Sequence, residues 1–310
     1  IYNMFPHITD AETDRVYGTV DKEEKAEGIV HFFDTDSTST YDSSDTDDGP
    51  LEQSSSTRKF IPLMLNDSGL ELTIEEDTSQ ELGCRLWTAA VMLYGYLRQQ
   101  QQGSDDNLLT NKHVLEIGAG LGVGGFTAAA NGATHVTIGE CGPQAIARLV
   151  QTLQTYRKNS PHENSNVTVC RHLWEEDLEY LDAQAEGRSM DTIYHWSKCD
   201  HSGQVPTLDF KSTFDIVIGS DLLYFSSQEQ PLLAVLRLHL ERDGVAVLFQ
   251  TMRTNNVSIF ERFVEAARVY FDVTVVDLTA EELCWNQLNY LASETPHTTG
   301  YKRVTLRHNL

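Results

Sequence analysis

Short apolar runs alternate with helical patterns along most of the chain after residue 110. Seven runs have the length of buried strands, and they lie at 113–117, 135–138, 167–170, 214–218, 245–249, 273–276 and 303–306. Between them, apolar side chains recur at i, i+3, i+4 and i+7 within 143–159 and 256–270, as on one face of a helix. This alternation predicts an α/β fold with a doubly wound, seven-stranded, mostly parallel sheet.

Two more predicted strands come before this alternation. Residues 60–65 and 70–74 are apolar runs on either side of the turn sequence Asn-Asp-Ser-Gly, which predicts an N-terminal β-hairpin. A helical pattern follows over 86–98. We therefore expect one domain over 60–310.

Two polar stretches interrupt the pattern. Residues 34–57 are rich in Ser, Thr and Asp, and they carry too few apolar side chains to offset the entropy of ordering. Residues 1–59 are therefore expected to form an acidic, low-complexity, partly disordered extension. Residues 175–212 hold many acids and only scattered apolar side chains, so we interpret them as a long loop inserted in the domain.

The composition is that of a soluble globular protein with an acidic balance. The 310 residues are 40% hydrophobic and carry a formal net charge of −23. The sequence shows no cluster of basic residues that could bind phosphate groups, so we expect neither a nucleic-acid partner nor binding to an anionic membrane. The same charge favours a protein partner with a basic surface.

The cysteines and histidines give little sign of a metal. Five widely spaced cysteines, without a C-x-x-C pair, fit a reduced intracellular protein. We expect it to be cytoplasmic, with the nucleus left open, and monomeric. His195, Cys199 and His201 lie close together, but a fourth ligand at regular spacing is not evident, so we favour a polar loop and expect no metal.

A glycine-rich turn follows the first strand of the alternation. Gly118, Gly120 and Gly122 let the backbone approach a ligand because no Cβ is in the way. Dinucleotide enzymes use the spacing G-x-G-x-x-G to bind a pyrophosphate, and Gly120, Gly122 and Gly125 satisfy it. Enzymes that bind S-adenosylmethionine place an acid two positions before the first glycine, where this chain has Glu116. Since a carboxylate attracts a sulfonium and repels a pyrophosphate, the turn favours S-adenosylmethionine.

Two other acids also follow predicted strands. Glu140 comes 22 residues after Gly118, where an acid can accept hydrogen bonds from both ribose hydroxyls. Asp221 ends a later strand, and Tyr224, three residues on, would share its face in a helical turn. Methyl transfer needs a nucleophile that is held in line and kept from water. A carboxylate beside an aromatic wall can orient and desolvate a lysine amine for that step.

Together these motifs resemble the family-16 seven-β-strand protein methyltransferases, whose characterised members mostly methylate lysine. The likeness spans about 60–310 and rests on the G-x-x-x-W-x-A-A motif at 83–90, the glycine motif at 116–122, the tripeptide at 172–174 and the S-D-x-x-Y motif at 220–224. The chain departs from the family pattern in Thr88, where Pro is frequent, and in Glu140, where Asp is frequent.

The resemblance implies an S-adenosylmethionine-dependent methyltransferase that acts on a lysine of a protein substrate. It implies Asp221 and Tyr224 as catalytic residues that face the acceptor side chain. The residues that it implies for cofactor binding are Trp87, Glu116, Gly118, Ala119, Gly120, Gly122, Glu140, Leu173, Trp174 and Ser220.

Several alternatives stay open. The acceptor could be a histidine, an arginine or a small molecule, because acidic charge does not separate these from lysine. The chain could also be a catalytically silent module that keeps the cofactor fold, although Asp221 and Tyr224 argue against it. An NAD-linked oxidoreductase fits the glycine spacing but not Glu116. Arg253, after the fifth strand of the sheet, could touch the substrate, but we favour a surface role for it.

Overall fold

The structure is a computed structural model that describes residues 57–99, 107–160, 166–189, 205–278 and 298–309. These residues belong to one compact unit, which begins at Ser56. The first described strand starts at Arg58. Nearly all of the predicted extension over 1–59 therefore lies outside the described residues, and its disorder stays a prediction.

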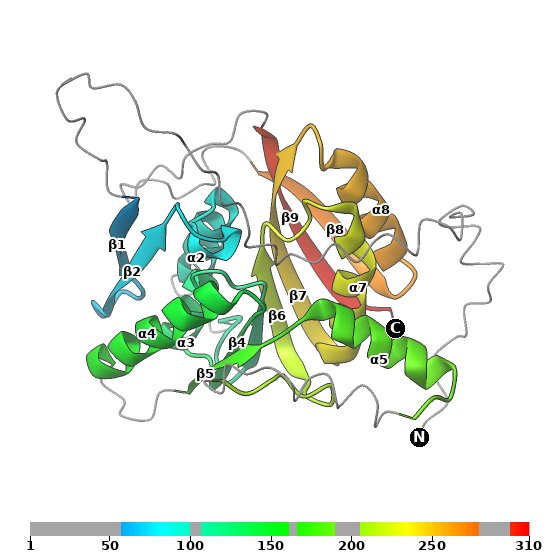
Figure 1. The fold of residues 1–310 in the computed structure, drawn as a ribbon, viewed down its shortest axis with the longest axis horizontal. Helices are drawn as coiled ribbons and strands as arrows, with labels where there is room; N and C mark the ends of the chain where they lie inside the picture. The colour runs from blue at the N-terminus through cyan, green and yellow to red at the C-terminus, as the bar shows by residue number, and fades with distance from the viewer. Residues whose placement is uncertain (1–56, 100–106, 161–165, 190–204, 279–297, 310) are drawn as a thin grey trace, which may run out of the picture. The chain divides into compact units, whose positions relative to one another are not determined.

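A seven-stranded sheet forms the centre of the unit (Figure 1). Its strands are β3 (His113–Ile117), β4 (His135–Glu140), β5 (Val167–Arg171), β6 (Phe214–Ser220), β7 (Leu240–Arg253), β8 (Phe271–Leu278) and β9 (Thr298–His308). They lie in the order β5-β4-β3-β6-β7-β9-β8. The first five are parallel, and β9 runs antiparallel to both of its neighbours. The predicted doubly wound, mostly parallel sheet is confirmed.

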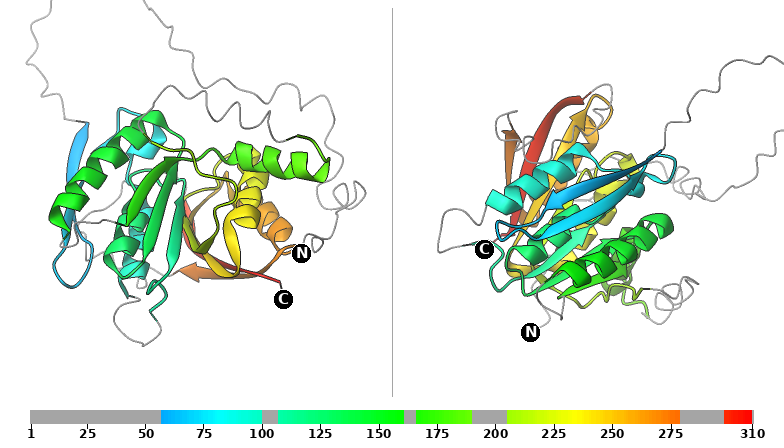
Figure 2. Two further views of the ribbon diagram at one scale, coloured as in Figure 1. Left: turned by 90° about the horizontal axis from the view of Figure 1, so that it is seen from below. Right: turned by 90° about the vertical axis from the view of Figure 1, so that its left-hand side faces the viewer.

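Helices cover both faces of this sheet (Figure 2). One face carries α2 (Thr88–Gln99), α3 (Val123–Ala130) and α4 (Pro143–Asn159), and the other carries α5 (Trp174–Ala185), α7 (Glu229–His239) and α8 (Val257–Ala267). The chain order reverses between β3 and β6, so a crevice opens at the carboxyl ends of these strands. Among the described residues, no helix has the length and apolar character to cross a membrane.

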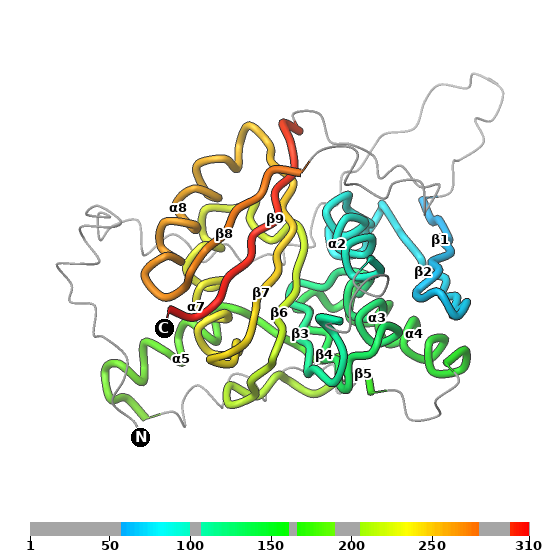
Figure 3. Tube along the Cα trace, turned by 180° about the vertical axis from the view of Figure 1, so that it is seen from behind, coloured from blue at the N-terminus to red at the C-terminus, as the bar shows by residue number. Residues whose placement is uncertain are grey.

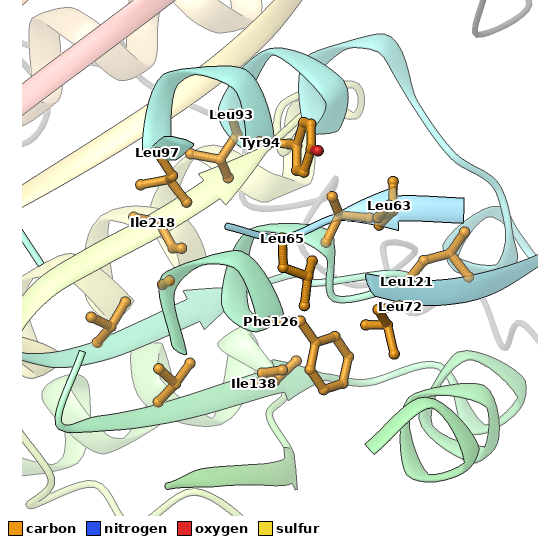
Figure 4. Packing of buried hydrophobic residues seen from close by; sticks show 14 of the residues in the cluster. Leu63, Leu65, Leu72, Leu93, Tyr94, Leu97, Leu121, Phe126, Ile138 and Ile218 are labelled. Atoms are coloured by element: carbon orange, nitrogen blue, oxygen red, sulfur yellow. The ribbon is translucent and has the colours of Figure 1, made fainter. Parts of the chain in front are cut away.

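The predicted hairpin is also present and packs beside α2 and α4 (Figure 3). It consists of β1 (Arg58–Met64) and β2 (Glu71–Asp77). Leu63, Leu65 and Leu72 bury their side chains near Phe126 of α3 (Figure 4). The Tyr94 hydroxyl of α2 donates a hydrogen bond to the Met64 carbonyl at 2.5 Å. The hairpin thus completes the hydrophobic core on this side of the sheet.

The prediction of a loop over 175–212 is wrong for the first part of that range, because α5 extends to Ala185. Three acids in the first turn suit a helix N-terminus, where the backbone dipole is positive. Tyr180 and Ala183 are buried, and the Tyr180 ring stacks on Phe210 with centroids 4.7 Å apart. Scattered apolar side chains therefore suffice for one buried face. Residues 190–204 lie outside the described residues.

The helix α7 was not predicted either, and it contacts β6 and β7 on the same face of the sheet as α5. Six consecutive residues of this helix are buried, from Pro231 to Leu236. A helix that is apolar nearly all round gives no 3.6-residue period, so periodicity does not distinguish it from a strand.

Candidate active site

A cavity of about 320 Å³ lies at the carboxyl ends of β3, β4 and β6. Its volume falls at the lower end of the range of small-molecule sites. Nine of the twelve predicted site residues line it, namely Trp87, Gly118, Gly120, Glu140, Leu173, Trp174, Ser220, Asp221 and Tyr224. The sheet therefore brings together motifs that are more than a hundred residues apart in the chain.

The floor of the cavity is the glycine turn after β3. Gly118 and Gly120 have φ angles of 53° and 54°, a conformation that disfavours side chains. A Cβ on Gly118 would lie 2.9 Å from the Trp174 ring and from Leu222, and one on Gly120 would lie 3.1 Å from the carbonyl oxygen of Gly83. Side chains at these positions would intrude on the cavity.

Glu140 joins this turn to the turn after β4. Its Oε2 accepts a hydrogen bond from the Gly120 N–H at 2.7 Å, and its Oε1 accepts from Cys141 and Gly142 at 2.8 and 3.0 Å. The side chain lines the cavity. A carboxylate offers about four acceptor positions, so Oε2 keeps capacity for a ligand hydroxyl.

Glu116, in contrast, lies beneath the turn and is not part of the cavity lining. Its side chain is buried, and its two oxygens accept hydrogen bonds from Gly124 and Gly125 at 3.0 and 2.8 Å, in the first turn of α3. Burial raises the pKa of Glu116 to about 8, while the two N–H donors act to lower it. The prediction that this carboxylate faces a cationic sulfur is therefore wrong.

Ala119 and Gly122 also lie outside the lining. The Ala119 N–H donates to the Gly139 carbonyl at 3.1 Å and so holds the turn against β4. Gly122 precedes α3 with φ 72°, and a Cβ there would lie 2.5 Å from Leu149. Both residues shape the turn, and their part in cofactor binding stays a prediction.

Other acids supply the negative charge that was expected from Glu116. Glu140, Glu175 and Asp221 line the cavity, and Arg253 is the one arginine or lysine among its described lining residues. The formal charges of these four side chains add up to a negative cavity. A cationic ligand is favoured there over a pyrophosphate.

Asp221 is held by an ion pair with Arg253, the last residue of β7. The guanidinium donates from Nη1 to Oδ1 at 3.0 Å and from Nη2 to Oδ2 at 2.7 Å. The Arg253 side chain is only 14% exposed, and its Cζ lies 5.7 Å from the centroid of the Trp87 ring. The interpretation of Arg253 as a surface residue is wrong. Its place at a strand end next to that of Asp221 was the signal for a role in the site.

Gln250 is a second residue of the site that the sequence analysis missed. It is buried in β7, and its side-chain amide donates to Asp221 Oδ1 at 3.0 Å. Its own Oε1 accepts from the Leu223 N–H at 3.0 Å. Gln250 thereby fixes both the side chain of Asp221 and the backbone that follows it.

Aromatic side chains stand on two sides of the cavity. The Trp87 indole N–H donates to the Leu82 carbonyl at 3.1 Å, which fixes the ring. Tyr224 is half-buried and meets Phe225 edge to face, with centroids 4.8 Å apart. Burial raises the pKa of Tyr224, and the charges of Glu140 and Asp221 add to this effect. Its hydroxyl is therefore protonated at neutral pH and can donate a hydrogen bond.

A buried His–Asp–His cluster adjoins the cavity, because His172 is part of the lining. Asp177 accepts from Nε2 of His172 at 2.7 Å and contacts Nε2 of His239 at 3.3 Å. Burial alone would raise the pKa of Asp177, but the hydrogen bonds from both imidazoles outweigh it and lower the pKa overall. The three side chains are close enough to hold a metal ion. The candidates His195, Cys199 and His201 lie outside the described residues.

Comparison with known proteins supports the resemblance drawn from the motifs. Residues 66–195 match the family model described as lysine methyltransferase. The protein N-terminal and lysine N-methyltransferase EFM7 of Candida albicans is 25% identical over 191 residues, which are 61% of this chain and 64% of that protein. The chain thus spans less than two thirds of the length of this relative. The predicted family resemblance is confirmed for the matched segment.

One solved structure agrees with the fold. The complex of SMU.776, a candidate methyltransferase, with SAH has a TM-score of 0.50 and 13% identity, and the match covers 83% of this chain and 57% of that one. A candidate SAM-dependent methyltransferase from Streptococcus mutans gives a TM-score of 0.49, 13% identity and the same two coverages. At this identity, the first likeness is evidence for the fold alone.

Proposed function

We propose that this chain, whose residues 66–195 match the lysine methyltransferase family, transfers a methyl group from S-adenosylmethionine to a lysine amine of a protein. One observation carries the proposal. The cavity brings Gly118 and Glu140, from the cofactor motifs, together with Asp221 and Tyr224, from the acceptor motif. Binding and acceptance of a methyl group need these two sets of groups in one enclosed place.

The residues present fit S-adenosylmethionine. Gly118 and Gly120 line the cavity without side chains, so they take none of its volume, and Leu173 and Trp174 in the same lining offer apolar surface for a planar base. Glu140 has acceptor capacity for ribose hydroxyls. The acids of the lining favour a sulfonium, whose charge they balance.

The acceptor half of the cavity suits an amine nucleophile. When bound, S-adenosylmethionine supplies an activated methyl group, so the protein needs no metal or strong base to make the carbon electrophilic. Trp87 and Tyr224 shield the acceptor nitrogen from water, which would otherwise solvate its lone pair. Asp221, fixed by Arg253 and Gln250, offers a rigid hydrogen-bond acceptor that orients the amine.

The proposed substrate is a protein that presents a lysine on a basic surface. The chain carries a formal charge of −23, which would steer a basic protein toward it and weaken that attraction at high salt. A nucleic acid would meet the opposite effect.

Titration calorimetry tests the cofactor half of the proposal. The protein should bind S-adenosylmethionine and give no heat with NAD. The variant Glu140→Gln, which loses acceptor capacity next to Gly120, should bind S-adenosylmethionine about 10- to 100-fold more weakly. Glu179→Gln, at an exposed position of α5, is the matched control and should bind normally. Heat with NAD alone would overturn the proposal.

A further inference from the structure

We propose that Arg253 is a positioning residue of the acceptor site, which neutralises Asp221 so that the acceptor amine binds without a charge. The inference rests on the proposed function and assigns a role to a residue outside the four matching motifs. It also separates lysine from arginine as the acceptor.

Arg253 and Asp221 form a bidentate and largely buried ion pair. The planar guanidinium of Arg253 donates one hydrogen bond to each oxygen of Asp221, which is the strongest arrangement for a guanidinium and a carboxylate. The two side chains are 14% and 6% exposed, and both line the cavity. They come from the ends of β6 and β7, which are neighbours in the sheet.

The backbone of Asp221 is fixed as firmly as its side chain. Its φ of 56° lies in the left-handed region, which costs energy for a residue other than glycine. The Asp221 N–H donates to the Phe249 carbonyl at 2.8 Å, and the Thr251 N–H lies 3.3 Å from Oδ1. Contacts from β7 thus impose both the conformation and the direction of the carboxylate.

The charge of this carboxylate matters for the chemistry. An isolated aspartate in an enclosed site would hold a lysine side chain as ammonium, because an opposite charge favours the charged form. An ammonium has no lone pair and cannot accept a methyl group. A nearby cation has the opposite effect and activates a lysine nucleophile. Arg253 places that cation at the carboxylate itself.

The other charged groups that face the cavity do not replace Arg253. Glu140 is held by three backbone N–H groups, and Glu175 is an exposed acid in the first turn of α5. Tyr224 is protonated at neutral pH, and Cys141 is exposed at the mouth. His172 turns its Nε2 to Asp177. In the described lining, Arg253 alone carries a permanent positive charge.

The transfer itself is balanced without a protein base. The acceptor ammonium first releases one proton to water. The amine lone pair then forms the N–C bond while the electrons of the breaking S–C bond stay on sulfur, and the methylated nitrogen takes up the positive charge. A guanidine acceptor would meet a carboxylate whose two oxygens are already engaged by a guanidinium. The site therefore favours an amine over an arginine side chain.

The test is the pH dependence of kcat, which reports groups in the enzyme–substrate complex. The probe is the lysine-centred synthetic peptide that the wild-type protein labels best with tritiated methyl groups, and an arginine-centred library is run beside it. Arg253→Met leaves Asp221 uncompensated, so the apparent pKa at which kcat rises with pH should increase by about one unit. At pH values below that pKa, kcat should be about tenfold lower than in the wild type. Arg253→Lys keeps the charge and should leave the rise within about 0.3 units.

Two more variants keep the inference falsifiable if Arg253→Met does not fold. Asp221→Asn leaves the guanidinium uncompensated, so the rise should move to lower pH. The double variant Asp221→Asn/Arg253→Met restores the balance and should bring the rise back to that of the wild type. Single variants that lower kcat equally at every pH would overturn the inference while leaving the proposed function intact. Wild-type labelling of arginine alone, or of neither library, would overturn both.

Discussion

The carboxylate of Glu116 accepts a hydrogen bond from the backbone N–H of Gly125 at 2.8 Å, and both groups are buried beneath the glycine turn. The N–H of Gly124 binds the other oxygen of the same carboxylate. The acid of the glycine motif thus occupies the N-terminus of α3, where free N–H groups and the helix dipole favour it. It acts on the turn that carries Gly118 and Gly120, and through that turn on the cavity.

The first prediction concerns the stability that this contact provides. Glu116→Gln would turn an amide NH₂ toward one of the two N–H donors, so one hydrogen bond is lost and a buried donor is left unsatisfied. We expect a loss of about 1–3 kcal/mol in the free energy of unfolding, measured in urea. Glu261→Gln, at an exposed position of α8, is the control and should unfold like the wild type. Equal stability of the two variants would contradict the role of Glu116.

The second prediction is the pH dependence that follows from the raised pKa of Glu116. The pKa rises from 4.5 to about 8 on folding, so the folded protein binds this proton more tightly than the unfolded chain. The stability from this group is complete below pH 4.5 and is lost as the pH rises through 8. Urea unfolding at pH 5, 6, 7 and 8 should show a smaller decline in Glu116→Gln than in the wild type. Parallel curves would refute this linkage.

The third prediction concerns the buried His–Asp–His cluster beside the cavity. Asp177→Asn would leave His172 and His239 without their shared carboxylate, which we expect to cost about 3 kcal/mol at neutral pH. The folded pKa of Asp177 is lowered, so its contribution is present above 3.8 and is lost as the pH falls through the folded value. The difference between wild type and variant should therefore shrink below pH 4.

Urea unfolding measures this difference, and Asp272→Asn, exposed in β8, is the control. A variant of Asp177 that unfolds like the control at neutral pH would show that the cluster contributes nothing to stability. A difference that persists undiminished at pH 3 would contradict the direction of the pKa shift.

The fourth prediction concerns the floor of the cavity. In Gly118→Ala the new Cβ would lie 2.9 Å from Trp174 and Leu222 at a positive φ, so the turn must shift. We expect the affinity for S-adenosylmethionine to fall at least about tenfold, equivalent to 1.4 kcal/mol. Gly187→Ala is a matched control, because Gly187 also has a positive φ but no heavy atom within 4 Å of the new Cβ. Equal losses of affinity in both variants would show that the contact of the new Cβ with Trp174 and Leu222 is not the cause.

The fold was predictable because periodicity is local. Each of the seven apolar runs lies within one strand of the sheet, and the carboxyl ends of parallel strands meet at one edge. Position at a strand end was therefore enough to place Glu140 and Asp221 in the cavity. The helices α5 and α7 were not predicted, because neither shows a clear apolar period in the sequence.

The parts of the site that were missed depend on packing between distant segments. Whether Glu116 faces a ligand or a helix N-terminus depends on where α3 lies over β3, which no local pattern specifies. The pair of Asp221 and Arg253 depends on the register of β6 against β7, because the partners are 32 positions apart in sequence. Residues 190–204 and 279–297 lie outside the described structure.

Transfer of a labelled methyl group to lysine would show directly that the cavity carries out the proposed reaction. A cell extract is incubated with the protein and S-adenosylmethionine that bears a trideuterated methyl group, and its proteins are then analysed by mass spectrometry. We expect trideuteromethyl lysine in at least one protein, and the loss of this signal with Asp221→Ala. Label confined to histidine, arginine or small molecules, or an undiminished lysine signal with Asp221→Ala, would contradict it.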